Sequence, residues 1–378
     1  MVAAHTALAE SLLGHEVSML AHHSVGERDR AEGMIKNAPV KALVPVDLLP
    51  PPGRLDQILG RDTHHLLAQR IRASDMVVVH GLWTSTVRQA ASIAWRSGVP
   101  YVILPHGMLD PWSLHHKGWK KRLALALAFR RILKRATVIQ TTSVEEREGV
   151  QLLDLRVPVE VIPNGIFLEE VDPLPTKGTF YTVHPELEGR PFILFLGRLH
   201  HIKGLDFLVD AFQSLAREYP RLQLVLAGPD GGGRSSIEAQ VQSLGLQERI
   251  RLVGPIYGRA KYAALMDAQC FCLPSRHENF GIVVAEAMAT RTPVVISDQV
   301  QIWPEVKEAG AGLVVPLDAQ ALSKALAQVL GDDALRQRMG QAGRALVQER
   351  FAWPQIASQT IEAYQRHLVD TKTAARSR

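Results

Sequence analysis

Long apolar runs are missing from this chain of 378 residues. No run approaches the roughly 18 residues that a membrane-spanning helix needs, which argues against an integral membrane protein. The first residues also lack the basic segment followed by an apolar stretch that is typical of a signal peptide. We therefore expect this protein to work in the cytoplasm.

Cysteine is scarce as well. Cys270 and Cys272 occupy alternate positions of one apolar segment, a pattern that favours small buried thiols over a disulfide. No Asp-x-Asp sequence occurs anywhere in the chain. Four His-His pairs begin at His22, His64, His115 and His200. None of these pairs has a third ligand at a recognisable spacing, so we expect no metal and no cofactor.

A large excess of one charge is absent from both halves of the chain. The net charge of +5 and the pI of about 9.2 fit a nucleic-acid-binding protein when taken alone. However, residues 1–172 contain 20 basic and 18 acidic residues, and the remainder contains 23 and 20. The basic character is concentrated in Lys117–Arg135, which has eight basic residues and no acid. We therefore expect no nucleic acid partner.

The length and the order of elements predict two globular α/β domains. A chain of this size suits two domains, each with a sheet between layers of helices. Short apolar segments alternate with amphipathic helical patterns in both halves, which predicts parallel sheets in two Rossmann-like, doubly wound domains. The expected strands are Val17–Ala21, Met76–Val79, Tyr101–Leu104, Thr137–Thr141, Val159–Ile162, Phe192–Leu196, Leu222–Ala227, Ile250–Val253, Cys270–Pro274 and Pro293–Ser297.

The domain boundary is expected where periodicity disappears. Residues 173–190 carry three prolines and two glycines, and they show no sustained helical or strand pattern. We therefore expect an N-terminal domain at 1–172, a linker at 173–190 and a C-terminal domain at 191–353. A last helix and tail, 354–378, would cross back to the N-terminal domain.

The first candidate site follows the strand Phe192–Leu196. Ligands of open parallel sheets bind at the carboxyl ends of the strands, so two facing sheets would form one deep cleft between the domains. Gly197 permits close approach of a ligand to the backbone. Arg198 and Lys203 place two cations at a helix N-terminus, which suits a diphosphate. A basic surface loop without a ligand is the alternative.

The second candidate site is Ser275–Ala289. Glu278 precedes a predicted helix and Glu286 lies about two turns inside it, which separates the carboxylates by roughly 12 Å along the axis. That span suits a nucleotide-sugar, with one carboxylate on hexose hydroxyls and the other on ribose. Free N–H groups of Asn279–Ile282 would point toward a phosphate. An acidic helix cap with one solvated glutamate is the alternative, although the apolar surroundings of Glu286 demand a partner for its carboxylate.

Several motifs together resemble the C-terminal domain of family 4 retaining glycosyltransferases of GT-B fold. The motifs are Gly197-Arg198, Lys203-Gly204, the Glu278-to-Glu286 element with Asn279-Phe280-Gly281, Pro293-Val294-Val295 and Pro304-Glu305-Val306. They occur in the family's order at plausible spacings, and the resemblance covers nearly the whole chain. It implies two Rossmann-like domains that face each other across a cleft, the first on the acceptor side and the second binding a nucleotide-sugar.

The resemblance implies roles for individual residues. Arg198 and Lys203 would bind the donor diphosphate. Glu278 would contact the sugar and take part in catalysis, and Glu286 would bind ribose. The nucleobase would be held largely through backbone groups of the turn Gly254–Ile256. The implied donor-binding residues are Gly197, Arg198, Lys203, Gly254, Ile256, Glu278, Asn279, Phe280, Gly281, Ile282 and Glu286.

A further candidate, His106, follows the strand Tyr101–Leu104. It lies in Pro105–Trp112, and the continuation Met108–Trp112 resembles a bacterial polysaccharide-assembly branch of the family. The family carries a histidine or an aspartate-bearing turn here beside the anomeric centre, which implies that His106 hydrogen-bonds the donor or orients the acceptor hydroxyl. A histidine that caps a buried turn is the alternative.

One departure from the family concerns the start of the chain. Family members have a strand and a Gly-Gly turn before the first helix, whereas the predicted helix His5–Leu13 begins almost at Met1. Loss of the first strand of a parallel sheet would expose apolar surface, so we expect that the recorded start lies too late.

The resemblance predicts transfer of a hexose-type sugar from a nucleotide-diphosphate donor to a hydroxyl of a glycan or lipid-linked acceptor, in cell-surface polysaccharide biosynthesis. No motif places a carboxylate nucleophile under the anomeric carbon, so we expect same-face attack without a metal, in which the departing diphosphate takes the acceptor proton. A nucleotide-sugar 2-epimerase of the same architecture and an inactive donor-binding remnant are the alternatives.

The basic segment Lys117–Arg135 has two interpretations. In the first, its cations lie on anionic lipid headgroups, and the protein is peripheral on the inner face of the cytoplasmic membrane. In the second, it is an ordinary amphipathic core helix with a basic solvated face. The apolar residues expected to face inward are Trp119, Leu123, Leu127 and Leu133.

Overall fold

The structure is a computed structural model that describes residues 2–22, 44–49, 63–115 and 118–376. The chain forms two compact units, one of residues 1–165 with 353–378 and the other of residues 166–352. The stretch 173–190, which we expected to be the linker, lies within the second unit and contains α11 (Thr179–Val183) and η3 (Pro185–Leu187).

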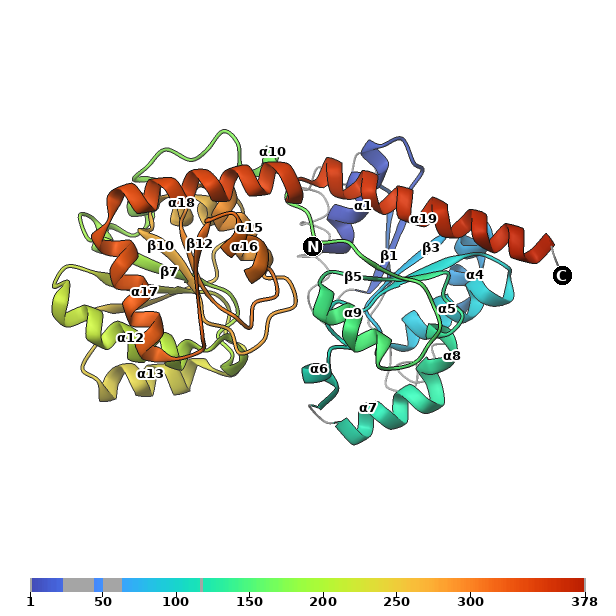
Figure 1. Ribbon diagram of the computed structural model, residues 1–378, viewed down its shortest axis with the longest axis horizontal. Helices are drawn as coiled ribbons and strands as arrows, with labels where there is room; N and C mark the ends of the chain where they lie inside the picture. Colours follow the sequence, from blue (N-terminus) through green and yellow to red (C-terminus); the bar gives the residue numbers. More distant parts are fainter. Residues whose placement is uncertain (1, 23–43, 50–62, 116–117, 377–378) are drawn as a thin grey trace. The chain divides into compact units, whose positions relative to one another are not determined.

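A six-stranded parallel sheet forms the centre of the second unit. Its strands run in the order β12-β11-β10-β7-β8-β9 (Figure 1). They are β7 (Phe192–Leu196), β8 (Gln223–Ala227), β9 (Ile250–Gly254), β10 (Cys270–Leu273), β11 (Val294–Ser297) and β12 (Gly312–Val315). This is the order of a doubly wound Rossmann fold, and the direction of winding reverses between β7 and β10. Most of these strands are continuously apolar because helices cover both faces.

The helices of the second unit form two layers on this sheet (Figure 1). One layer contains α12 packed against α13 and α17, and the other contains α15 packed against α14 and α18. Their bounds are α12 (Leu205–Glu218), α13 (Arg234–Ser243), α14 (Gly258–Asp267), α15 (Ile282–Ala289), α17 (Ala319–Gly331) and α18 (Asp333–Leu346). Shorter elements are α10 (Leu168–Val171), η4 (His201–Lys203), α16 (Trp303–Glu308) and η5 (Val347–Phe351). Cys270 and Cys272 are free and fully buried between the layers, as predicted.

The first unit contains two parallel sheets. One sheet has the order β3-β4-β5-β6, and β1 and β2 form a separate pair. The strands are β1 (Met19–His22), β2 (Val46–Leu49), β3 (Val77–His80), β4 (Tyr101–Leu104), β5 (Val138–Thr141) and β6 (Val159–Val161). The expectation of a strand upstream of Met1 concerns residues outside this sequence and stays a prediction.

Helices connect and cover the strands of the first unit. They are α1 (Val2–Leu12), α4 (His64–Arg72), α5 (Ser85–Arg96), α6 (Pro111–His115), α7 (Gly118–Ala124), η2 (Leu125–Phe129), α8 (Arg130–Leu133), α9 (Val144–Gln151) and α19 (Trp353–Arg376). The last helix packs against α1. Its buried Tyr364 donates a hydrogen bond of 2.6 Å to Gln140 Oε1 in β5, which connects the end of the chain to the sheet. None of the helices described here combines the length and apolar character needed to cross a bilayer.

The basic segment differs from the expected single α-helix. It consists of α7, one π-helical turn (η2) and α8, and Lys117 lies outside the described residues. Leu133 is fully buried, but Trp119, Leu123 and Leu127 are 70%, 52% and 78% exposed. The prediction that all four face inward was therefore wrong for three of them. These three follow one another at intervals of four residues, so they lie along one solvent-facing side of the helical segment.

The buried carboxyl of Glu10 in α1 leads us to predict an unusual pH dependence of stability. Burial raises the pKa of this carboxyl to about 7, so the folded chain holds a proton that the unfolded chain releases near pH 4.5. Stability should therefore fall by up to about 3 kcal/mol as the pH rises from 4.5 to 8. We expect Glu10→Gln to abolish this loss, measured as the difference in thermal midpoint between pH 5 and pH 8. The exposed Glu16→Gln is the control, and an unchanged pH dependence in Glu10→Gln would contradict the assignment.

Candidate functional site

The loops that follow β7 and β10 meet at the point where the sheet reverses its winding. Gly204 has φ of 64°, and a Cβ atom there would lie 1.8 Å from the carbonyl oxygen of Pro274. The Arg276 N–H donates a 2.7 Å hydrogen bond to Ile202 O. Glycine at 204 therefore allows the two loops to touch, and the crevice of this fold class lies at such a reversal.

Three glycines line the carboxyl ends of β7, β8 and β9. At Gly228, where φ is 150°, a Cβ atom would lie 1.8 Å from the carbonyl oxygen of Gly197. The N–H of Gly228 donates a 2.8 Å hydrogen bond to Gly254 O. Gly197 and Gly254 are half-buried and Gly228 is buried, so no Cβ atom separates these strand ends. Gly254 is the position expected to hold the nucleobase, and the half-buried Ile256 follows two residues later.

Arg198 lies in the loop after β7. Backbone hydrogen bonds to the loop after β8 hold this loop in place. The flanking Leu199 is buried, its N–H donates to Pro229 O, and its carbonyl oxygen accepts from the N–H groups of Gly231 and Gly233, all at 2.9 Å. The Arg198 side chain is exposed and has no hydrogen-bond or ion-pair partner among the residues described. A cation on a fixed backbone is thus available to an anionic ligand.

Lys203 and Glu278 form an ion pair between the two loops. The Lys203 ammonium contacts Glu278 Oε2, and the two side chains are 17% and 21% exposed. The backbone of Glu278 is also held, because its N–H donates to Gln299 O at 3.1 Å and its carbonyl oxygen accepts from Gln301 N–H at 3.0 Å. The structure therefore brings together the two residues expected to bind diphosphate and sugar.

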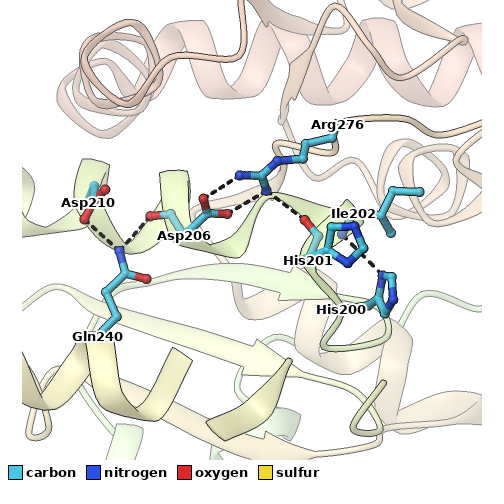
Figure 2. A network of polar contacts seen from close by, with 7 residues as sticks. All are labelled: His200, His201, Ile202, Asp206, Asp210, Gln240 and Arg276. Atoms are coloured by element: carbon cyan, nitrogen blue, oxygen red, sulfur yellow. Dashed lines mark hydrogen bonds and ion pairs between the residues drawn. The ribbon is translucent and has the colours of Figure 1, made fainter. Parts of the chain in front are cut away.

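A second ion pair joins the loop after β10 to the first turn of α12 (Figure 2). Arg276 makes a bidentate pair with Asp206, at 2.7 and 2.6 Å, and donates a further 2.7 Å hydrogen bond to His201 O. Gln240 of α13 donates to Asp206 O and to Asp210 Oδ1. Bidentate pairing fixes the geometry of a guanidinium, so this network sets the position of the loop that carries Lys203.

The N-terminus of α15 adjoins the ion pair. Gly281 has φ of 76°, and Val300 leaves no room for a Cβ atom there. Among the described residues, no acceptor lies within hydrogen-bond distance of the N–H groups of Gly281 and Ile282, as expected for a site that receives a phosphate. The Phe280 ring, by contrast, is buried against Phe351, so its side chain belongs to the core and only its backbone is available to a ligand.

Glu286 is the fifth residue of α15, just over one turn from its start rather than two. Its carboxylate is 9% exposed and pairs with the Lys261 ammonium of α14 at 2.6 Å. The predicted need for a partner is met by this lysine, which itself is 11% exposed. Glu286 therefore has a structural interaction within the protein in addition to the expected contact with ribose.

His106 lies in the first unit, in a turn held by Glu146. The N–H of Gly107 donates to Glu146 Oε1, and Thr142 donates from its N–H to Oε2 at 2.9 Å. The His106 backbone has φ of 53°, uncommon for a residue with a side chain. Burial lowers the pKa of His106 to about 4, so its ring is neutral at physiological pH.

Two family profiles match consecutive parts of the chain. Residues 2–165 match the description "Glycosyl transferase 4-like domain", and residues 179–346 match "Glycosyl transferases group 1". The chain belongs to this family of glycosyltransferases, which has the GT-B fold. The recognition based on the motifs at Arg198, Lys203, Glu278 and Glu286 is thereby confirmed at the level of the family.

Curated members of the glycosyltransferase family include relatives of moderate similarity. A phosphatidyl-myo-inositol mannosyltransferase from Mycobacterium leprae is 36% identical over 211 residues, which are 54% of this chain and 52% of the relative. A D-inositol 3-phosphate glycosyltransferase from Kineococcus radiotolerans is 32% identical over 252 residues, which are 62% of this chain and 58% of the relative. The chain thus spans a little over half the length of these curated relatives.

Solved structures share the fold of this glycosyltransferase. HepE from Anabaena, solved with UDP and glucose, gives a TM-score of 0.74 at 18% identity and covers 93% of this chain and 100% of its own. Sucrose-phosphate synthase from Thermosynechococcus elongatus gives a TM-score of 0.70 at 22% identity. The match covers 94% of this chain and 100% of the synthase chain. Both comparisons support the two Rossmann-like domains predicted from the sequence.

Four residues that shape these sites were missed in the sequence: Gly228, Lys261, Arg276 and Glu146. Gly228 starts a conspicuous glycine-rich segment, Gly228–Gly233, directly after a strand, and this signal was present. Lys261 and Glu146 gave no local signal, because each acts on a partner that is distant in sequence or hidden in a turn. In the part of the chain that is described, no group of three His, Cys, Asp or Glu is arranged to hold a metal ion.

We expect the buried ion pair Lys261–Glu286 to affect the stability of the fold. Glu286→Gln leaves the ammonium buried without its counter-charge, which should lower the free energy of unfolding by about 3–5 kcal/mol. The double variant Lys261→Met/Glu286→Leu replaces both charges with apolar groups and should recover most of that loss. Chemical denaturation measures both effects. Glu278→Gln, at the more exposed pair, is the matched control with a smaller expected loss, and equal losses for the two glutamines would refute the argument.

Proposed function

We propose that this protein transfers a hexose-type sugar from a nucleoside-diphosphate donor to a hydroxyl group of a glycan or lipid-linked acceptor, with retention of anomeric configuration. The observation that supports this most directly is the arrangement at the reversal of winding. There the Lys203–Glu278 pair adjoins the N-terminus of α15, and Arg198 precedes Lys203 in the loop after β7 of the second unit.

The donor diphosphate would bind to two cations and to backbone amides. Arg198 has no carboxylate partner among the described residues, so it meets the diphosphate without losing an existing contact. Lys203 would exchange Glu278 for a phosphate oxygen. The positive end of the α15 dipole and the N–H groups of Gly281 and Ile282 add to this attraction.

The two glutamates would then recognise the two ends of the donor. Glu278, released from Lys203, accepts hydrogen bonds from sugar hydroxyls, while Glu286 contacts ribose. Nothing lies within 4 Å of a Cβ atom placed on Gly254, which leaves space for the nucleobase near Ile256. HepE, a protein of the same fold, was solved with UDP and glucose, which supports a donor of this class.

The reaction would break the bond between the anomeric carbon and the phosphate oxygen and form the bond to the acceptor oxygen on the same face. The acceptor proton passes to the departing phosphate oxygen, so no enzyme nucleophile and no metal ion is required. Arg198, Lys203 and the helix N-terminus stabilise the charge that develops on the diphosphate. His106, neutral at physiological pH, hydrogen-bonds the donor or orients the acceptor hydroxyl.

Glu278→Gln tests this assignment. Loss of the carboxylate should lower kcat by a factor on the order of 10²–10³, as for other preorganised polar contacts, because the amide no longer holds the sugar hydroxyls in the transition state. The affinity for a nucleoside diphosphate without sugar should not fall, since Lys203 is freed. Turnover is measured with UDP-, GDP- and ADP-hexoses, and affinity by calorimetry. Glu238→Gln, in an exposed pair of α13, is the control.

Product analysis by NMR separates the competing functions. Retention requires the product to keep the anomeric configuration of the donor. Inversion of a donor carbon without acceptor would identify an epimerase, and donor binding without turnover would identify a binding protein. Full activity in both Glu278→Gln and Glu286→Gln would refute the proposed site.

We also propose that the segment 118–135 docks on an anionic membrane, which would place the protein on the inner face of the cytoplasmic membrane, in cell-surface polysaccharide assembly. Its exposed Trp119, Leu123 and Leu127 lie among Lys120, Arg122, Arg131 and Lys134. An apolar stripe flanked by cations suits lipid headgroups better than water. The acceptor of the Mycobacterium leprae relative is, by its name, a phosphatidylinositol, which agrees with a lipid-linked acceptor here.

Vesicle sedimentation tests the membrane proposal. Leu127→Ser should weaken binding to phosphatidylglycerol vesicles roughly tenfold or more, because one fully inserted leucine contributes about 1.5–3 kcal/mol. Leu152 on the same unit is equally exposed, at 78%, but lies outside the stripe, so Leu152→Ser should bind like the wild type. High salt should weaken the vesicle binding of the wild type and of both variants. Absence of binding at low salt would end this proposal.

A further inference from the structure

A second histidine, His80, contacts His106. His80 is the last residue of β3, and His106 lies just after the neighbouring strand β4. His80 Nδ1 lies 2.9 Å from His106 Nε2, and the two rings are stacked with their centroids 5.2 Å apart and their planes 15° from parallel. No local sequence pattern connects these residues, which are 26 positions apart.

The contact between His80 Nδ1 and His106 Nε2 is a hydrogen bond only if one of these two nitrogens carries a hydrogen. Burial lowers the pKa of His80 to about 3, and that of His106 to about 4, so both rings are neutral at pH 7. Two neutral imidazoles form a hydrogen bond only when one nitrogen donates and the other accepts. The tautomer of one ring therefore determines the tautomer of the other, and with it the character of His106 Nδ1.

The surrounding turns hold both rings in place. The N–H of Gly81 donates a 2.8 Å hydrogen bond to Leu104 O, which joins the ends of β3 and β4. Met108 lies over Gly81, where a Cβ atom would be 3.5 Å from the methionine methyl group. On the other side, Glu146 holds the N–H of Gly107. The backbone of His106 is therefore fixed, and His80 is the hydrogen-bond partner of its ring among the described residues.

We propose that His80 is a positioning residue, which fixes the ring orientation of His106 through the Nδ1–Nε2 hydrogen bond and couples the tautomers of the two rings. His106 Nδ1 is then held in one position toward its ligand, and its role as donor or acceptor is linked to the tautomer of His80. The catalytic part of this proposal rests on the proposed function, in which His106 serves the donor or the acceptor hydroxyl. The structural part does not.

Two variants separate hydrogen bonding from packing. In His80→Asn the amide takes the place of Nδ1 and is able to donate or to accept, so the contact to His106 is preserved. In His80→Phe an aromatic ring that is able to stack remains, but the hydrogen bond is lost. His65→Phe makes the same chemical change at an exposed position of α4 and is the control.

The first measurement is ¹⁵N NMR of the His106 ring in the purified full chain at pH 7.5. We expect the ¹⁵N shift of His106 Nε2 to report a hydrogen bond in the wild type, in His80→Asn and in His65→Phe, and a nitrogen without that hydrogen bond in His80→Phe. Thermal midpoints identify any variant that fails to fold, in which case His80→Leu replaces His80→Phe. An unchanged ¹⁵N shift of His106 Nε2 in the folded apolar variant overturns the proposal, whether or not the protein is a transferase.

The second measurement is sugar transfer. The apolar variant should lower kcat by about tenfold to a hundredfold with little change in KM for the donor, because a misoriented catalytic group slows the chemical step. His80→Asn should restore kcat to within about threefold of the wild type. Wild-type kcat in His80→Phe would overturn the catalytic part. If no transfer occurs in any form, the proposed function fails, and the NMR result still decides the positioning role.

Discussion

The ion pair between Lys203 and Glu278 is the contact on which the candidate donor site depends. It joins the loops after β7 and β10, the two strands between which the sheet reverses its winding. Several otherwise unrelated features serve this contact. Gly204 lets the loops approach, and the Arg276–Asp206 pair fixes the loop of Lys203 from the other side. Without the Glu278 carboxylate, the Lys203 ammonium, whose side chain is 17% exposed, would lose its counter-charge.

Burial distinguishes the two glutamates more clearly than spacing does. Each pairs with a lysine, yet Glu278 is about one-fifth exposed and Glu286 less than one-tenth. Water screens and competes with the outer pair, so a ligand exchanges it at small cost. The inner pair cannot be broken without leaving a buried charge. The outer glutamate is therefore suited to a contact that forms and breaks, and the inner one to a contact added to a permanent pair.

The sequence predicted the alternation of strands and helices well because continuous apolar runs such as Phe192–Leu196 leave little choice of structure. It missed β2 and β12, since Val46–Leu49 is a four-residue run between prolines and Gly312–Val315 begins with glycine. Arg198, Lys203, Glu278 and Glu286 could be singled out from motifs, but their partners could not. Lys261 and His80 acquire their importance only when distant segments meet, which no local pattern encodes.

The charges of the two loops suggest why diphosphate and sugar recognition should be linked. Of the three cations Arg198, Lys203 and Arg276, two are matched by carboxylates, and Arg198 alone has no partner among the described residues. One unmatched cation does not neutralise a diphosphate. In the proposed function, a second would become available when Lys203 leaves Glu278, and that same exchange would free a carboxylate for sugar hydroxyls. Binding of the leaving group would therefore prepare the contact that holds the transferred group, which would favour the intact donor over either fragment.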